Sequence, residues 1–270
     1  MVTAGMTVAL LTGVPAGTWF AGAQGWRATF WLLAGLGICV AVGVMLTAPD
    51  IPGGEPASLA NRLGPLRSLP VARLVAATFL CGAGGMMFYS YLAPVTAALA
   101  NGSYQLLSIV LLVVGVVGIG GVVLGGRSTD AWGPRRARQL AIGGHGGALL
   151  LVAVFAFRGT RSAVVFAVLV AVWSVFAWAL NPPMQASVLA AAPHAGMTAM
   201  ALNISALYLG TGVAGVLGGA IVDLTAANFV PLAGGVLLLI ALFFASLREH
   251  RTRASPVTPD APAHDSAPGH

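Results

Sequence analysis

Charged residues are scarce in this sequence. Only 7% of its 270 residues are charged, whereas soluble domains carry about 25% charged residues. Too few polar side chains remain to cover a globule with a wetted surface, which excludes an ordinary cytosolic enzyme, a disordered protein and a nucleic-acid binder. Lysine is absent, because all 13 basic residues are arginine, so the chain has no P-loop and does not itself hydrolyse ATP.

Catalytic and metal-binding motifs are also missing. The sequence contains neither GxSxG nor HExxH. The two cysteines, Cys39 and Cys81, lie inside apolar runs, which favours packing over a disulfide or a metal pair. His145 has no second ligand within helical reach, and we interpret it as a packing or interfacial histidine. We therefore predict no catalytic residue, no metal, no cofactor and no enzymatic activity.

Long uncharged stretches dominate the chain instead. Hydrophobic residues make up 58% of it, and the mean hydropathy is +0.90. A charge at the bilayer centre costs about 2.5–3.5 kcal/mol on insertion scales, so charged residues mark the loops. A spanning helix needs about 20 apolar residues. The stretches therefore predict an all-α multi-pass membrane protein with eight transmembrane helices. Their approximate limits are 2–22, 28–48, 72–98, 105–125, 138–157, 163–190, 198–222 and 228–247.

The arginines are distributed unevenly between alternate loops. Ten of the 13 lie in 49–71 or just after it at Arg73, in 126–138 or after residue 247, and only Arg27, Arg158 and Arg161 lie on the other side. The positive-inside rule places the arginine-rich loops in the cytoplasm. With an even number of spans, both termini are predicted to be cytoplasmic, and the protein is predicted to reside in the inner (plasma) membrane.

The loop 49–71 has the composition of a linker, since it begins with Pro52-Gly-Gly-Glu-Pro56 and is the longest connection. We place a boundary there. Segment 1–48 then carries two helices, 49–71 is a cytoplasmic linker and 72–248 is a six-helix bundle. The tail 249–270 is rich in Pro, Ala, His and Asp without an apolar face, and we predict that it is disordered.

Two segments of the six-helix unit are alike. Gly125–Asp130 and Gly218–Asp223 both read GGxxxD after a glycine-rich apolar run. The two helices lie three spans apart, and an odd offset reverses their direction. This pattern is typical of the inverted repeats of secondary transporters.

Three longer motifs carry a family resemblance. Gly13-Val-Pro-Ala-Gly17, Gly126-Arg-Ser-Thr-Asp130-Ala-Trp-Gly133-Pro-Arg135-Arg136 and the stretch 181–219 resemble the major facilitator superfamily, nearest to its arabinose-efflux-like and chloramphenicol-exporter-like drug:proton antiporters. The resemblance covers about residues 1–248. It implies that the eight helices are helices five to twelve of a partial major facilitator fold, with an intact C-terminal six-helix bundle. The four N-terminal helices are then expected to be missing.

The resemblance also implies a substrate cavity lined by the helices 72–98 and 163–190. Trp178, Asn181 and Gln185 are spaced to share one helical face. Aromatic side chains with a few hydrogen-bonding groups and no fixed charge suit a mostly apolar ligand. The candidate cavity residues are Phe88, Tyr89, Tyr91, Trp173, Trp178, Asn181, Gln185, Asn203 and Tyr208.

A second group of residues is implicated in gating. Pro15 removes a backbone hydrogen bond and should bend its helix, and the resemblance implies a role in preventing proton leak. Asp130 can accept hydrogen bonds from helix N-termini or pair with a neighbouring arginine. A plain positive-inside anchor is the alternative. The gating candidates are Gly13, Pro15, Gly17, Gly126, Asp130, Gly133, Arg135 and Arg136.

Taken together, the residues and the resemblance predict proton-coupled efflux of small, mostly apolar compounds by alternating access. The expected partners are a small-molecule substrate, the lipid bilayer, protons and a missing N-terminal half, with no nucleic acid. No acidic residue lies deep in any predicted span, so no coupling carboxylate is evident. A sugar or metabolite transporter on the same fold and a truncated, non-transporting remnant remain as alternatives.

Overall fold

The computed structural model describes residues 24–47, 58–100, 104–159 and 161–247, together with the helical positions Gly13, Gly17 and Phe20. Within these ranges the chain contains helices and turns but no strand. Seven helical segments are long and apolar enough to cross a membrane. They correspond to the last seven predicted spans and confirm the all-α fold class. The first predicted span, 2–22, lies outside the described residues except at the three isolated positions.

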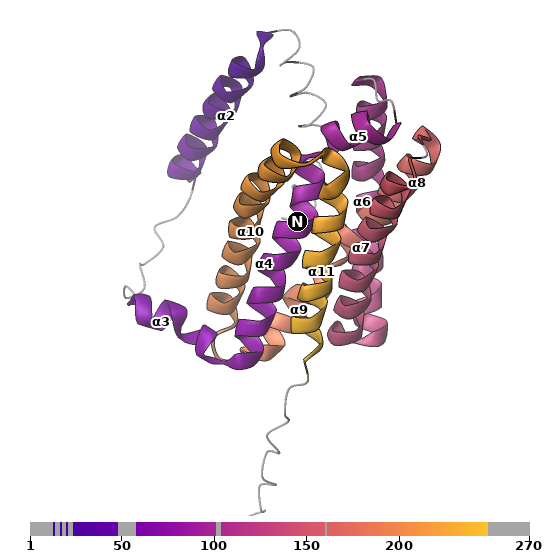
Figure 1. Ribbon diagram of the computed structural model, residues 1–270. Coiled ribbons are helices and arrows are strands. Elements are labelled where there is room, and N and C mark those ends of the chain that lie inside the picture. The colour runs from indigo at the N-terminus through magenta and orange to yellow at the C-terminus, as the bar shows by residue number, and fades with distance from the viewer. Residues whose placement is uncertain are drawn as a thin grey trace, which may run out of the picture.

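From Leu69 onward the helices follow one another with short connections, and Figure 1 shows them assembled into one bundle. Helix α2 stands apart, and its side chains are exposed. The helices are α2 (Trp26–Thr47), α3 (Leu59–Leu63), the 3₁₀ turn η1 (Gly64–Arg67), α4 (Leu69–Ser90), α5 (Leu92–Ala100), α6 (Tyr104–Trp132), α7 (Pro134–Phe157), α8 (Ala163–Ala179), α9 (Asn181–Ala191), α10 (Gly196–Leu224), the 3₁₀ turn η2 (Ala227–Phe229) and α11 (Val230–Ser246).

Two of the predicted spans are interrupted. The span predicted at 72–98 consists of α4 and α5, which meet at Tyr91. The span predicted at 163–190 consists of α8 and α9, which meet at Leu180. Prolines follow both interruptions: Pro94 lies in the first turn of α5, and Pro182 lies in the first turn of α9. A proline is tolerated in the first turn of a helix, where its missing N–H would have no helical partner.

Helix α6 is longer than predicted. It continues to Trp132, seven residues beyond the expected end at residue 125, so the segment Gly126–Asp130 is helical and not part of a loop. The turn into α7 is made at Gly133, whose φ of +79° lies in the region that only glycine adopts freely. Charged residues thus mark the end of the apolar run, but the helix itself extends past them.

Helix α4 lies at the centre of the bundle, packed against α10, α11 and α9, while α7 packs against α11, α8 and α6. Glycines allow several of these helices to approach backbone to backbone. A Cβ at Gly84 would lie 2.6 Å from the carbonyl oxygen of Gly234, and a Cβ at Gly210 would collide with the carbonyl oxygen of Phe79. Small residues at helix contacts are the usual solution in lipid, where close packing replaces the hydrophobic drive between helices.

The interior and the outer surface of the bundle are both apolar. Phe88, Phe166 and Ile142 are among the largest fully buried side chains. On the outside, Val164 and Val216 are each 74% exposed. A soluble protein rarely exposes so continuous an apolar surface, whereas a lipid-facing surface requires one.

The contact at Gly210 gives the first prediction. We expect Gly210→Ala to destabilise the bundle by about 1–3 kcal/mol, because the added methyl group must push α10 away from α4. Gly212→Ala is the matched control on the same helix, since a Cβ there meets no atom within 4 Å. Thermal unfolding of both variants in detergent measures the difference. Equal melting temperatures would show that the α4–α10 contact is not a tight one.

Candidate functional site

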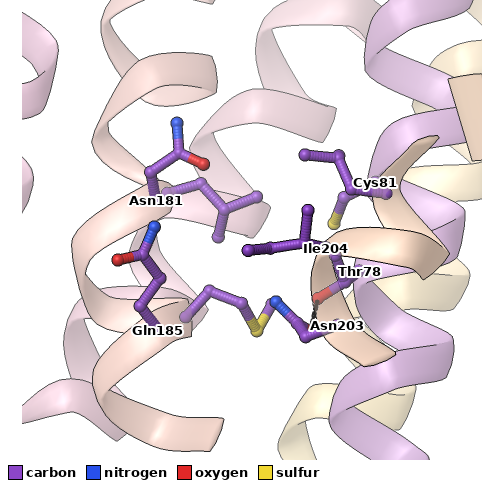
Figure 2. Close-up of a pocket in the computed structure, with 9 residues that line it drawn as sticks. Thr78, Cys81, Asn181, Gln185, Asn203 and Ile204 are labelled. Carbon is purple, nitrogen blue, oxygen red and sulfur yellow. Dashed lines mark hydrogen bonds between the residues drawn. The ribbon is translucent and has the colours of Figure 1, made fainter. Parts of the chain in front are cut away.

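A small pocket opens between α4, α9 and α10. Its volume is about 60 Å³, and Figure 2 shows the side chains that line it. Thr78 and Cys81 come from α4, and Asn181 and Gln185 come from α9. The full lining consists of Thr78, Cys81, Leu180, Asn181, Met184, Gln185, Asn203, Ile204 and Leu207. None of these nine residues carries a formal charge at neutral pH.

The interruption between α8 and α9 positions the amides of the pocket. Asn181 is the first residue of α9, and Gln185 follows one turn later on the same side of the helix. Both side chains are exposed, so their polar atoms are accessible from the pocket. On the opposite wall, Asn203 of α10 is 5% exposed.

Asn203 is held by a hydrogen bond across the helix interface. The Thr78 hydroxyl donates to its side-chain carbonyl oxygen at 2.6 Å. This bond fixes the direction of the amide, and in Figure 2 its nitrogen points toward α9. The pocket therefore combines an oriented N–H donor, two further amides and apolar walls from residues such as Met184 and Leu207. Such a lining can bind an uncharged molecule with a few hydrogen-bonding groups.

The structure brings three of the nine predicted cavity residues together at this pocket, namely Asn181, Gln185 and Asn203. Phe88 and Trp173 lie instead in the buried core, with ring centroids 5.0 Å apart in an edge-to-face contact. Aromatic rings fill interior space as effectively as they line a cavity, so their positions differ from the expectation.

The other predicted aromatic residues also lie away from the pocket lining. Tyr89 stacks on Trp173 with ring centroids 6.4 Å apart. The Tyr91 hydroxyl donates to the Gly215 carbonyl oxygen at 2.7 Å. Tyr208 is 65% exposed on α10. Trp178 lies before the interruption at Leu180, so it does not share the face of the two α9 amides. Its indole ring packs against Gly118 of α6.

Six lining residues were not among the predicted cavity residues. The hydroxyl of Thr78 within an apolar stretch was a usable signal, because a polar group there needs a partner. The remaining five offer no such signal, since sulfur-bearing and aliphatic side chains are common throughout the spans. They are Cys81, Leu180, Met184, Ile204 and Leu207.

The predicted gating residues fall into two groups. Gly13 and Gly17 are helical, and Pro15 lies outside the described residues. Gly126 and Asp130 lie in the last two turns of α6, and Gly133 forms the turn that follows.

The expected pairing of Asp130 with an arginine is not present. No arginine in the described ranges forms a salt bridge with the carboxylate within 4.0 Å, because the extended α6 leaves Asp130 on an exposed face. Arg136 is likewise exposed. Arg135 instead donates to the Ser246 carbonyl oxygen at 3.2 Å, and Arg138 donates to that of Ala245 at 2.9 Å. The C-terminal carbonyls of a helix carry partial negative charge and attract cations.

The described part of the chain contains no group of three or more His, Cys, Asp or Glu side chains that could hold a metal ion. The pocket lining likewise offers neither a nucleophile beside a base nor a pair of carboxylates. The arrangement is therefore suited to reversible binding.

Comparison with known proteins agrees with this picture. The Major Facilitator Superfamily model matches residues 1–198. The chain is 29% identical to the uncharacterized MFS-type transporter YbcL of Bacillus subtilis, 30% identical to the inner membrane transport protein YdhP of Escherichia coli K12 and 32% identical to the chloramphenicol resistance protein of Streptomyces lividans. Each match covers 91% of this chain and 62% of the relative.

The chain thus spans less than two thirds of the length of the relatives that it matches. The match nevertheless extends over most of its own residues, with the apolar helices of a multi-pass inner-membrane protein. It confirms the resemblance carried by the sequence motifs. The chain belongs to the Major Facilitator Superfamily of membrane transporters.

Proposed function

We propose that the chain takes part in secondary transport, exporting small, uncharged and mostly apolar compounds in exchange for protons. The observation that carries this proposal is the pocket between α4, α9 and α10, in which amides and one hydroxyl project from apolar walls without a fixed charge. The chloramphenicol resistance protein among the relatives supports the efflux direction.

The size of the pocket indicates how much of the substrate it contacts. A drug-sized ligand occupies a site of about 300–1,000 Å³, whereas this pocket measures about 60 Å³. We infer that the pocket binds one polar group of the substrate and that helices of an N-terminal half form the rest of the cavity wall.

The interrupted helices support alternating access. The α8–α9 interruption leaves a helix that can bend at Leu180, which lines the pocket, and the α4–α5 interruption lies farther along α4, at Tyr91. Discontinuous helices at a binding site are a recurrent feature of secondary transporters. At the Gly84–Gly234 contact the two backbones approach directly, which favours sliding or rocking over interlocked packing.

The arginine-bearing segments support the proposed orientation. Arg135 and Arg138 contact the C-terminal end of α11, so the 126–138 region and the end of α11 lie at the same end of the bundle. Segment α3–η1 lies at that end as well (Figure 1). We propose that this end is cytoplasmic, that 49–71 is the linker before the bundle 72–248, and that both termini and the tail 249–270 are on the cytoplasmic side.

A gate at Asp130 forms part of the proposal. Its carboxylate is exposed on the last turn of α6. In a second arrangement of the helices, the Asp130 carboxylate can bind a helix N-terminus or a cation that lies too far away in the arrangement described here. The exposed guanidinium of Arg136 can likewise form a new contact in that second arrangement.

One observation favours a second candidate substrate class. The three amides at the pocket would also bind the hydroxyl groups of a sugar or a related metabolite. The two substrate classes differ in how much they depend on the apolar wall, so transport of a panel containing both distinguishes them.

The first functional prediction concerns the α9 amides. We expect Asn181→Leu and Gln185→Leu each to raise the KM for chloramphenicol by roughly 2- to 10-fold, because each removes a hydrogen bond worth about 0.5–1.5 kcal/mol. Gln105→Leu is the control, since that amide lies at the start of α6, outside the pocket lining. The assay is uptake into everted vesicles under an imposed proton gradient, with this chain and with any longer reading frame that contains it. Unaltered KM values would remove the pocket from the substrate path.

The second functional prediction concerns the gate. We expect Asp130→Asn to change the transport rate without loss of membrane insertion, because it removes the charge but retains the size of the side chain. Transport kinetics in the same vesicles, normalised to the inserted protein, provide the measurement. Kinetics identical to those of the unsubstituted chain would leave Asp130 with an anchoring role only.

A further inference from the structure

His145 occupies an unusual position for a titratable residue. It lies in the interior of α7 and is only 4% exposed. Neither of its imidazole nitrogens has a hydrogen-bond partner among the described residues. The adjacent Trp173 of α8 is 3% exposed, and its indole N–H also lacks a partner. Three buried polar atoms on two touching side chains are therefore unsatisfied, which native proteins generally avoid.

The surroundings of His145 come from three helices. Its ring meets that of Trp173 edge-to-face, with centroids 5.8 Å apart and an interplanar angle of 65°. On the α4 side, a Cβ at Gly85 would lie 2.6 Å from Cε1 and 2.9 Å from Nε2 of the imidazole. Glycine at position 85 thus leaves the space that the ring occupies. The site is a cage for an imidazole, formed by α4, α7 and α8.

A packing role alone does not account for this arrangement. An aliphatic side chain would fill the same space without leaving two nitrogen atoms unsatisfied. An ionisable residue inside a membrane-spanning segment is rare and is by default a functional-site candidate. The interpretation of His145 as a plain packing histidine therefore does not explain what the structure shows around it.

We propose that His145 is a proton-binding site within the helical bundle, with Trp173 as its aromatic partner. The inference rests on the proposed proton-coupled transport. The unprotonated nitrogen of the neutral imidazole accepts a proton from water to give imidazolium, and the same nitrogen later returns it to water. The indole of Trp173 lies within the range of a cation–π interaction with the charged ring.

Proton binding at this site is linked to the arrangement of the helices. In the packed arrangement the charged ring would have Trp173 beside it, but no hydrogen-bond acceptor among the described residues. Water must reach the imidazolium, and it can do so only if α4, α7 and α8 separate near Gly85. A ligand shifts a conformational equilibrium toward the state that binds it better. A proton on His145 therefore favours the more open arrangement.

Few other titratable groups face this site. On α4, Cys81 and Tyr89 lie one turn before and one turn after Gly85, Tyr89 stacks on Trp173, and Arg73 lies near the start of the helix. Helices α8, α9 and α11 contain no titratable side chain. On α6 and α7 the remaining groups lie toward the helix ends: Tyr104, Arg127, Asp130, Arg135, Arg136 and Arg138. His145 is thus the imidazole enclosed in this part of the bundle.

The test uses the emission of Trp173 in the 270-residue chain in lipid nanodiscs. The Trp173 component is the spectrum of the unsubstituted chain minus that of Trp173→Phe. We expect it to fall as the pH is lowered through the acid range, because an adjacent imidazolium quenches indole emission. His145→Asn should abolish this pH dependence. His194→Asn is the matched control, since His194 is exposed in the turn before α10, and it should leave the titration unchanged.

A second measurement needs no substitution in the cage. Nitrogen NMR of isotope-labelled histidine in the unsubstituted chain reports whether a buried imidazole changes protonation over the same pH range. A Trp173 component independent of pH, or a titration that survives in His145→Asn, overturns the proposal. If both titrations occur but vesicles do not transport chloramphenicol, the proposed function fails and the proton site stands. If the vesicles transport chloramphenicol and neither titration occurs, the proton site fails and the proposed function stands.

Discussion

The structure depends on one constraint: lipid offers no hydrogen-bond partner, so each polar group in the spanning helices must find one within the protein. The hydroxyls follow this rule closely. Thr96 and Ser187 each donate to the carbonyl oxygen four residues earlier, and Ser174 donates to the Val114 carbonyl of the neighbouring helix. Against this background the exceptions stand out. The exposed amides of α9 and the unsatisfied rings of His145 and Trp173 are among the polar groups for which the described bundle supplies no complete set of partners. They are accordingly the groups to which we assign substrate and proton.

The same constraint explains why glycine positions the pocket. Polar bonds between helices are few, so the helices associate by close approach of their backbones. The contacts of α4 with α10 at Gly82 and Gly210, and with α11 at Gly84, place α4 at the centre. That placement brings the Thr78 hydroxyl within hydrogen-bonding distance of Asn203. The pocket is therefore a consequence of the close packing of α4 against α10, and it opens where α9 starts after an interruption.

Much of the fold was predictable from the sequence, because charge alone determines which stretches can lie in lipid. The helix ends were not, since a helix can continue past its apolar run into water, as α6 does with Asp130. Within the site, the amides at Asn181, Gln185 and Asn203 were predictable because a polar side chain in an apolar span needs a hydrogen-bond partner or a function. The aromatic residues were not, because a ring is equally stable in the core, at a cavity or against lipid. Which of these applies to Trp173 depends on Gly85 and His145, which lie far from it in sequence.

The two ends of the bundle are joined by different kinds of hydrogen bond. At the arginine-bearing end, Arg135 and Arg138 donate charge-assisted hydrogen bonds from α7 to α11. At the other end, a neutral bond from Tyr91 to the Gly215 carbonyl joins the end of α4 to α10. Charge-assisted hydrogen bonds are roughly twice as strong as neutral ones. The α7–α11 pair is thus joined at one end by charge-assisted bonds, whereas α4 and α10, which border the pocket, are joined by neutral hydrogen bonds and close glycine contacts.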